Sequence, residues 1–156
     1  MGNWTIDEML ALPTCYDRGT YEQLWAGSAT LTDLEVLQHA TPPPEDRAQI
    51  ISHMADGEVL RLWACDMVEQ AATPWPDHDA EVAELLEVSR AIAAGEAGNA
   101  ARRAAKRRYR YAPDHVRVLL HERGSVAARL VFTRLHTTDP ENGDDLLGLL
   151  ATRLGG

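Results

Sequence analysis

Apolar residues recur at helical spacing along most of this chain. The clearest stretch covers about residues 57–72, where they fall at i, i+3, i+4, i+7, i+8 and i+11: Leu60, Trp63, Ala64, Met67, Val68 and Ala71. This spacing gathers them on one face of a helix. A second helix of this kind is expected over 79–94, with Gly95 at its C-terminal cap. An Ala-rich segment, 100–111, and a last segment from Asp144 are also expected to be helical.

Sequence signals for helix starts support the same reading. Thr5 with Glu8, and Thr32 with Glu35, have the three-residue spacing of a capping box. Each pair predicts the start of a short helix. Pro44 ends a proline run, and proline is favoured in the first turn of a helix, so a further helix is expected to begin there.

The segment 115–136 allows two interpretations. Val116, Val118 and Leu120 alternate with other residues as in a strand, and Gly124-Ser125 could turn a hairpin. Pro113-Asp114 could instead start a helix whose apolar face carries Leu119, Leu120, Val126, Leu130 and Val131. We favour helices because the preceding segments are helical. We therefore predict a single all-α domain over 1–156, as a helical bundle or HEAT-like array of about seven to eight helices. The alternative is an α+β fold with a small hairpin at 115–136.

Composition fits an ordinary globular protein. The chain has 156 residues, 45% of them hydrophobic and 25% charged, with no apolar run of the roughly 20 residues that a membrane span needs. The N-terminal residues lack the basic and apolar regions of a secretory signal, so a cytoplasmic location and no membrane partner are expected. Cys15 and Cys65 are expected to stay reduced, with Cys65 packed as a small hydrophobe.

Charge changes the picture, because it is sorted along the chain. Residues 1–89 hold 17 Asp and Glu against three Lys and Arg, whereas residues 90–134 hold 11 basic residues against three acidic ones. The whole chain carries −9. Six basic residues crowd into nine positions: Arg102, Arg103, Lys106, Arg107, Arg108 and Arg110. Such sorting creates strong local fields that attract charged partners or draw parts of the chain together.

Three interpretations of this basic patch stay open. It could pair with the acidic helix over 79–87, so that two oppositely charged helices pack together. It could form a partner or homo-oligomer surface. It could also bind nucleic acid, because Tyr109 and Tyr111 lie among the arginines and aromatic rings beside arginine suit base stacking and phosphate contact.

The acidic half suggests a surface for a basic protein partner. Complementary charge accelerates association, and tryptophan is enriched where binding energy concentrates. Trp25 beside Gly27 and Trp75 between two prolines are the candidate exposed anchors. The candidate partner-binding residues are Trp25, Trp75, Glu81, Glu84 and Glu87.

Motifs for catalysis are missing from the sequence. It has no phosphate-binding glycine loop, no nucleophile elbow, no His-Glu-x-x-His and no Cys-x-x-Cys. His53 with Asp56 and Glu58, and His115 with His121 and Glu122, are the only groups that suggest a small enzyme. We assign no catalytic residue, metal ligand or cofactor.

The segment Glu58-Val59-Leu60-Arg61-Leu62-Trp63-Ala64-Cys65-Asp66 resembles the "LRLFAC"-type helix of bacterial all-helical proteins, including putative immunity proteins. In these a second helix ends in Ala-x-Gly and an Ala-rich helix follows, as at Ala93-Ala94-Gly95 and from Ala100 here. The resemblance covers about 56–111. It implies an α-helical array and toxin neutralisation, and no catalytic residues.

Together these observations predict a non-enzymatic interaction protein, of the immunity or antitoxin type, that binds a basic protein partner through an acidic helical surface. Binding of nucleic acid through the Arg-rich helix 102–110 is the first alternative. A small enzyme with a His/Asp/Glu site is the second.

Overall fold

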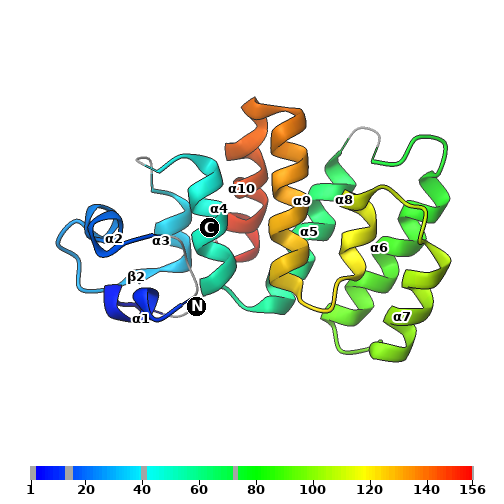
Figure 1. The fold of residues 1–156 in the computed structure, drawn as a ribbon, viewed down its shortest axis with the longest axis horizontal. Helices are drawn as coiled ribbons and strands as arrows, with labels where there is room; N and C mark the ends of the chain where they lie inside the picture. The colour runs from blue at the N-terminus through cyan, green and yellow to red at the C-terminus, as the bar shows by residue number, and fades with distance from the viewer. Residues whose placement is uncertain (1–2, 13–15, 40–41, 72–73, 156) are drawn as a thin grey trace. The chain divides into compact units, whose positions relative to one another are not determined.

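The computed structural model describes residues 3–12, 16–39, 42–71 and 74–155 (Figure 1). These residues form ten α-helices, two 3-10 helices and one pair of two-residue strands. The fold is therefore all-α, as the apolar spacing predicts. The helix count exceeds seven to eight because α2 (Arg18–Trp25) was not expected and because the segment 115–136 is divided between α8 (Asp114–Arg117) and α9 (Gly124–Thr138). The expected short helices are α1 (Ile6–Leu10) and α3 (Asp33–Leu37). Within the described ranges, no helix combines the length and apolarity needed to cross a bilayer.

Contacts divide the chain into two compact units. Unit 1 comprises Met1–Ala55 and Gly143–Gly156, and unit 2 comprises Asp56–Asn142. That all 156 residues form a single domain stays a prediction. Cys15 lies outside the described residues, and the thiol of Cys65 in unit 2 is free and buried. Burial raises the pKa of this thiol.

Unit 1 is built from short elements and the C-terminal helix. In addition to α1 and α3, it contains β1 (Asn3–Trp4), α2 (Arg18–Trp25), β2 (Leu31–Thr32), α4 (Pro44–Met54) and α10 (Gly143–Arg153). The strands pair antiparallel, with Asn3 opposite Thr32 and Trp4 opposite Leu31. Helix α10 packs against α3 and α4, so the chain returns to unit 1 after leaving it at Ala55.

The predicted helix starts of unit 1 are confirmed. Thr5 and Glu8 form both hydrogen bonds of a capping box at α1, and Thr32 and Glu35 do the same at α3. Each box satisfies two backbone groups that a helix start would otherwise leave without partners. Pro44 is in the first turn of α4, where its missing N–H costs no helical hydrogen bond.

Trp25 is part of the interior, so the prediction that it is an exposed anchor is wrong. Its side chain is 1% exposed, and its indole Nε1–H donates to the Trp4 carbonyl oxygen over 2.8 Å. The Tyr21 ring meets it edge-on, with centroids 5.8 Å apart. The β1 backbone thus accepts the hydrogen bond of the indole N–H, so the Trp25 side chain is buried without an unsatisfied donor.

Unit 2 consists of longer helices that pack in the order α9, α5, α6 and α7 (Figure 1). They are α5 (Gly57–Gln70), α6 (Asp79–Ala93), α7 (Asn99–Arg108) and α9 (Gly124–Thr138). Helix α8 and the 3-10 helix η1 (Val118–Leu120) pack against α9, and η1 also contacts α6 and α7. A second 3-10 helix, η2 (Pro140–Asn142), follows α9.

The predicted apolar face of α5 is buried. Leu60, Trp63, Ala64, Met67 and Val68 are all shielded from solvent. Asp56 caps the helix start, since its carboxylate accepts from the Glu58 N–H over 2.8 Å. These residues give unit 2 its central helix.

At the end of α6 the predicted glycine cap is confirmed. Gly95 has a φ of 74°, which favours glycine. The Glu96 and Gly95 N–H groups donate back to the Ala91 and Ile92 carbonyls, as in a Schellman motif.

The segment 115–136 is helical, and the hairpin alternative is wrong for it. Gly124 and Ser125 begin α9 instead of turning between strands. Gly124 is needed there because α5 passes very close. A Cβ atom on Gly124 would lie 1.9 Å from the Gly57 carbonyl oxygen. The two helices therefore approach at a distance that only glycine allows.

Candidate functional site

The basic patch lies on α7 and the residues just after it. Five of its six side chains are exposed, and four of these five form no ion pair within the described ranges: Arg103, Lys106, Arg107 and Arg110. We call these four the basic surface. Alanine fills most of the remaining α7 positions and favours the helix, so the long cationic side chains extend from a rigid backbone.

Neutralisation by the acidic helix α6 is confined to one ion pair. Although α6 packs against α7, only Arg108 reaches a carboxylate, with its Nη1 3.3 Å from Glu84 Oε1. Arg102 instead donates to the Leu120 carbonyl over 3.3 Å. Within the described ranges, none of the four residues of the basic surface has a carboxylate oxygen within 4.0 Å. Their charge is therefore left for other anions.

The two tyrosines of this segment have different surroundings. Tyr109 is buried and its hydroxyl donates to the Glu84 carboxylate, so its ring is not accessible for base stacking. Burial, together with this carboxylate, raises the pKa of Tyr109 to about 12. Tyr111 is 81% exposed, and the Arg110 guanidinium carbon lies 4.8 Å from its ring centroid. Only Tyr111 presents a free ring beside the arginines.

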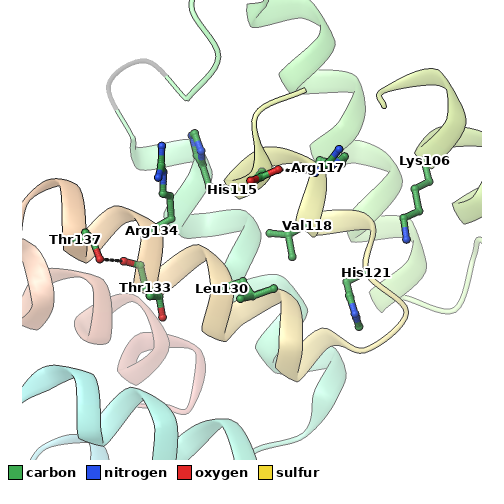
Figure 2. Close-up of a pocket in the computed structure, with 10 residues that line it drawn as sticks. Lys106, His115, Arg117, Val118, His121, Leu130, Thr133, Arg134 and Thr137 are labelled. Atoms are coloured by element: carbon green, nitrogen blue, oxygen red, sulfur yellow. Dashed lines mark hydrogen bonds and ion pairs between the residues drawn. The ribbon is translucent and has the colours of Figure 1, made fainter. Parts of the chain in front are cut away.

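A groove of about 590 Å³ opens beside the basic surface (Figure 2). One wall is the face of α9 that carries Leu130, Thr133, Arg134 and Thr137, which are spaced at i, i+3, i+4 and i+7. The opposite wall comes from α8 and η1, and Lys106 of α7 extends toward it. Lys106 thus belongs both to the basic surface and to the groove.

The groove combines an apolar floor with cationic ends. Figure 2 shows Val118 and Leu130 in the middle, with Lys106 and His121 at one end and Arg134 at the other. Leu130 is 45% exposed, which leaves apolar area open to a ligand. These groups would suit a ligand that carries both an apolar face and negative charge.

The remaining charged groups in the groove do not cancel this positive balance. Asp114 is a lining carboxylate, and it is paired with Arg117. His115 and His121 also line the groove, and burial lowers the pKa of both imidazoles. Near neutral pH the cations that remain without a carboxylate partner are Lys106 and Arg134, among the described residues that line the groove.

The predicted acidic partner-binding residues of α6 are not equally available. Glu84 already binds Arg108 and Tyr109. Glu81 lies 3.6 Å from His78 Nδ1, whereas Glu87 is exposed. Trp75 is half-buried and stacks on the His78 ring with centroids 4.1 Å apart.

The two histidine groups that suggested an enzyme are distributed over different parts of the fold. His53 belongs to unit 1, whereas Asp56 and Glu58 begin unit 2, and the Asp56 carboxylate caps α5. Glu122 does not line the groove that His115 and His121 share. Among the residues that the structure describes, no three His, Cys, Asp or Glu side chains could hold a metal ion together.

The groove itself was missed by sequence reasoning. The sequence did contain a signal for Leu130 and Arg134. Their spacing of four residues places a leucine and an arginine on the same face of a helix. Their position opposite Lys106 and Arg117 depends on how three separate helices pack, which the spacing does not contain.

Proteins of known family offer no guide to this site. The resemblance of 56–111 to the immunity group stays a prediction. Comparisons of the chain with protein families, with curated proteins and with solved structures find no match.

Proposed function

We propose that this protein binds nucleic acid through the basic surface of α7. The observation that carries this proposal is the absence of a carboxylate partner for Arg103, Lys106, Arg107 and Arg110 within the described ranges. Helix α7 packs against the acidic helix α6, yet these four cations stay without a carboxylate partner, so they are available to bind phosphates. Arginine is suited to this task, because its planar guanidinium can bind a phosphate with two hydrogen bonds.

The net charge of −9 does not oppose this proposal at short range. Unit 2 holds 14 Asp and Glu against 12 Lys and Arg, so it carries −2 of the total, and unit 1 carries −7. At 0.1 M salt the Debye length is about 10 Å, so charges beyond that distance are largely screened. A phosphate beside α7 therefore experiences mainly the local cations.

Titration of labelled DNA and RNA at several salt concentrations tests the proposal. If the four cations neutralise about four phosphates, the logarithm of the binding constant should fall against the logarithm of salt with a slope of about −3 to −4. The double substitution Arg103→Ala with Arg107→Ala should weaken binding to every sequence and reduce that slope by about 2.

A matched control removes two arginines from elsewhere in unit 2. Arg123→Ala with Arg129→Ala changes the net charge by the same amount outside the basic surface and should change binding much less. Equal loss from both pairs would mean that only overall charge matters. No measurable affinity at low salt would overturn the proposal.

Binding of a basic protein by unit 1 is a second candidate, and one observation favours it. Unit 1 holds ten Asp and Glu against three arginines, and each arginine is already engaged: Arg18 with Asp7, Arg47 with Asp144, and Arg153 with another group. Acidic residues thus outnumber the arginines, and unit 1 offers a basic partner a net charge of −7. An immunity or antitoxin-type protein would use such a surface against a basic toxin. Capture from a native lysate at low salt, lost at high salt, would support it, and no partner at either salt would contradict it.

A further inference from the structure

We infer that the groove beside the basic surface receives one unstacked base of a single-stranded nucleic acid. This inference rests on the proposed function, and it adds that the preferred ligand is a single strand. Lys106 links the two regions, because it belongs to the basic surface and also lines the groove. A strand whose phosphates lie along α7 would thus reach the groove without a break in positive charge.

The size of the groove selects against a duplex. Its volume of about 590 Å³ is in the range of ordinary small-ligand pockets, which accommodate a ligand as large as one nucleotide. In a duplex the bases are stacked and paired inside, so none can enter a pocket without being unpaired at a cost. A single strand can turn a base outward far more easily.

The chemistry of the groove matches the two halves of a nucleotide. Leu130 and Val118 form an apolar floor that one face of a base can cover. The imidazole rings of His115 and His121, at different places along the groove, offer flat surfaces for contact with a base. Lys106 at one end of the groove and Arg134 at the other supply positive charge for phosphates of the strand.

An acidic protein segment is the other ligand class with the same charge. The groove favours a base over such a segment because its apolar floor lies between cationic ends, which suits a flat ring on a charged backbone. An acidic segment would place carboxylates against the cations and leave the Leu130 side chain uncovered.

Fluorescence anisotropy with a labelled 12-residue thymidine strand and a 12-base-pair duplex tests the inference at about 50 mM salt. The wild-type protein should bind the strand at least about ten-fold more tightly than the duplex. Leu130→Asp places a negative charge on the floor and should weaken single-strand binding about ten-fold, the scale of one lost base contact, with duplex binding unchanged. A strand with 2-aminopurine near one end should change its fluorescence on binding to wild type and not to the Leu130 variant.

Controls separate this effect from unfolding and from general charge. Ser125→Asp adds the same charge to α9, five residues away along the helix, and should leave single-strand binding close to wild type. Leu130→Ser removes the apolar floor without adding charge and should weaken single-strand binding by a smaller factor. Circular dichroism of each variant should match that of wild type, because Leu130 is already partly exposed.

Each remaining outcome overturns at least one of the two proposals. If strand and duplex bind equally, and both lose affinity on Arg103→Ala with Arg107→Ala, nucleic-acid binding stands and the base-receiving groove is wrong. Single-strand preference that survives Leu130→Asp also overturns the groove. Competition by oligoglutamate as strong as by the thymidine strand would assign the surface to an acidic protein. Failure to bind either nucleic acid overturns both the proposed function and this inference.

Discussion

Arg47 in unit 1 and Arg61 in unit 2 are both buried, and they are neutralised in different ways. Arg47, 8% exposed, donates to the Leu37 and Pro42 carbonyls and forms an ion pair with Asp144 over 2.8 Å. Arg61, 3% exposed, donates only to carbonyls, which lie 2.5 to 3.1 Å from its guanidinium: those of Leu119, His121 and Glu122. Burial lowers the pKa of Arg61, although arginine stays charged near neutral pH.

This difference teaches how each unit uses positive charge. In unit 1 the few arginines connect separate segments, and acidic groups are left over. In unit 2 even the buried arginine has no carboxylate in the guanidinium contacts described, and the neighbouring Arg102 further lowers its pKa. Unit 2 therefore holds its buried arginine with backbone carbonyls, whereas carboxylates pair with Arg90 and Arg117. The carboxylates of α6 neutralise only one cation of the basic patch.

The largest expected effect concerns how tightly each unit is packed. Gly124→Ala in unit 2 forces a Cβ atom against the Gly57 backbone and should lower the free energy of unfolding by about 3 kcal/mol, the upper range for overpacking. Gly148→Ala in α10 of unit 1 meets no atom within 4 Å. It should stabilise the protein by up to about 1 kcal/mol, because alanine favours a helix. Urea unfolding followed by circular dichroism measures both.

Gly57→Ala is the matched control in unit 2, since a Cβ atom at Gly57 also meets open space. It should leave stability close to wild type. If Gly124→Ala proves equally mild, the close approach of α5 and α9 is relaxed in solution, and the packing contrast between the units disappears.

The second prediction compares the two buried arginines directly. Arg61→Met should lower the free energy of unfolding by about 3 kcal/mol, because it leaves the His121 and Glu122 carbonyls without the guanidinium donor. Arg47→Met should cost about 2 kcal/mol, since the abandoned Asp144 carboxylate is mostly exposed and water can solvate it. Chemical denaturation of both variants gives the two values.

Salt sharpens this comparison. The Arg47 ion pair should weaken as ionic strength rises, so the cost of Arg47→Met should shrink between 0.05 and about 1 M salt, where the Debye length falls to about 3 Å. The cost of Arg61→Met should stay constant, because its acceptors are uncharged carbonyls. Equal salt dependence would contradict the proposed difference in neutralisation.

The smallest effect concerns the hydrogen bond from the buried Tyr109 phenol, at the end of α7, to Glu84 of α6. Tyr109→Phe removes the hydrogen bond to Glu84 and should cost about 1 kcal/mol at neutral pH. Because the pKa of Tyr109 is raised to about 12 in the folded protein, its stabilising contribution is complete below about pH 10. That contribution is lost as the pH rises from about 10 towards 12.

Absorbance at alkaline pH checks this assignment. Wild type should show one phenol that ionises later than the others, and Tyr109→Phe should lack it. Tyr111→Phe, at an exposed ring, should retain the late transition and full stability. A wild-type titration with no delayed phenol would mean that Tyr109 is open to solvent.

Local patterns were enough to predict much of the fold. The capping boxes at Thr5 and Thr32, the apolar face of α5 and the glycine cap after α6 depend on residues a few positions apart, and all are confirmed. The strand-like alternation at Val116 to Leu120 misled only the hairpin alternative. There a short helix and a 3-10 helix bury Val116, Leu119 and Leu120, whereas Val118 lines the groove.

Features that depend on distant residues were not predictable in this way. Trp25 is buried because the β1 backbone accepts its indole hydrogen bond from 21 residues away. The charge of α7 is left unpaired because its register against α6 brings only Arg108 near a carboxylate. The groove requires α7, α8, η1 and α9 to meet. The distribution of charge along the sequence does not show which of these distant residues lie close together.

The interrupted course of unit 1 has a consequence for synthesis on the ribosome. Helix α10, which packs on α3 and α4 and supplies Asp144 to Arg47, is translated only after all 87 residues of unit 2. At 5–20 residues per second, the first 55 residues wait roughly 4 to 17 s for it. Unit 2 has its full set of helices before then, so the later half of the chain can fold first. The N-terminal segment is made earliest but completes its packing last, so it is the segment that needs the protection of chaperones.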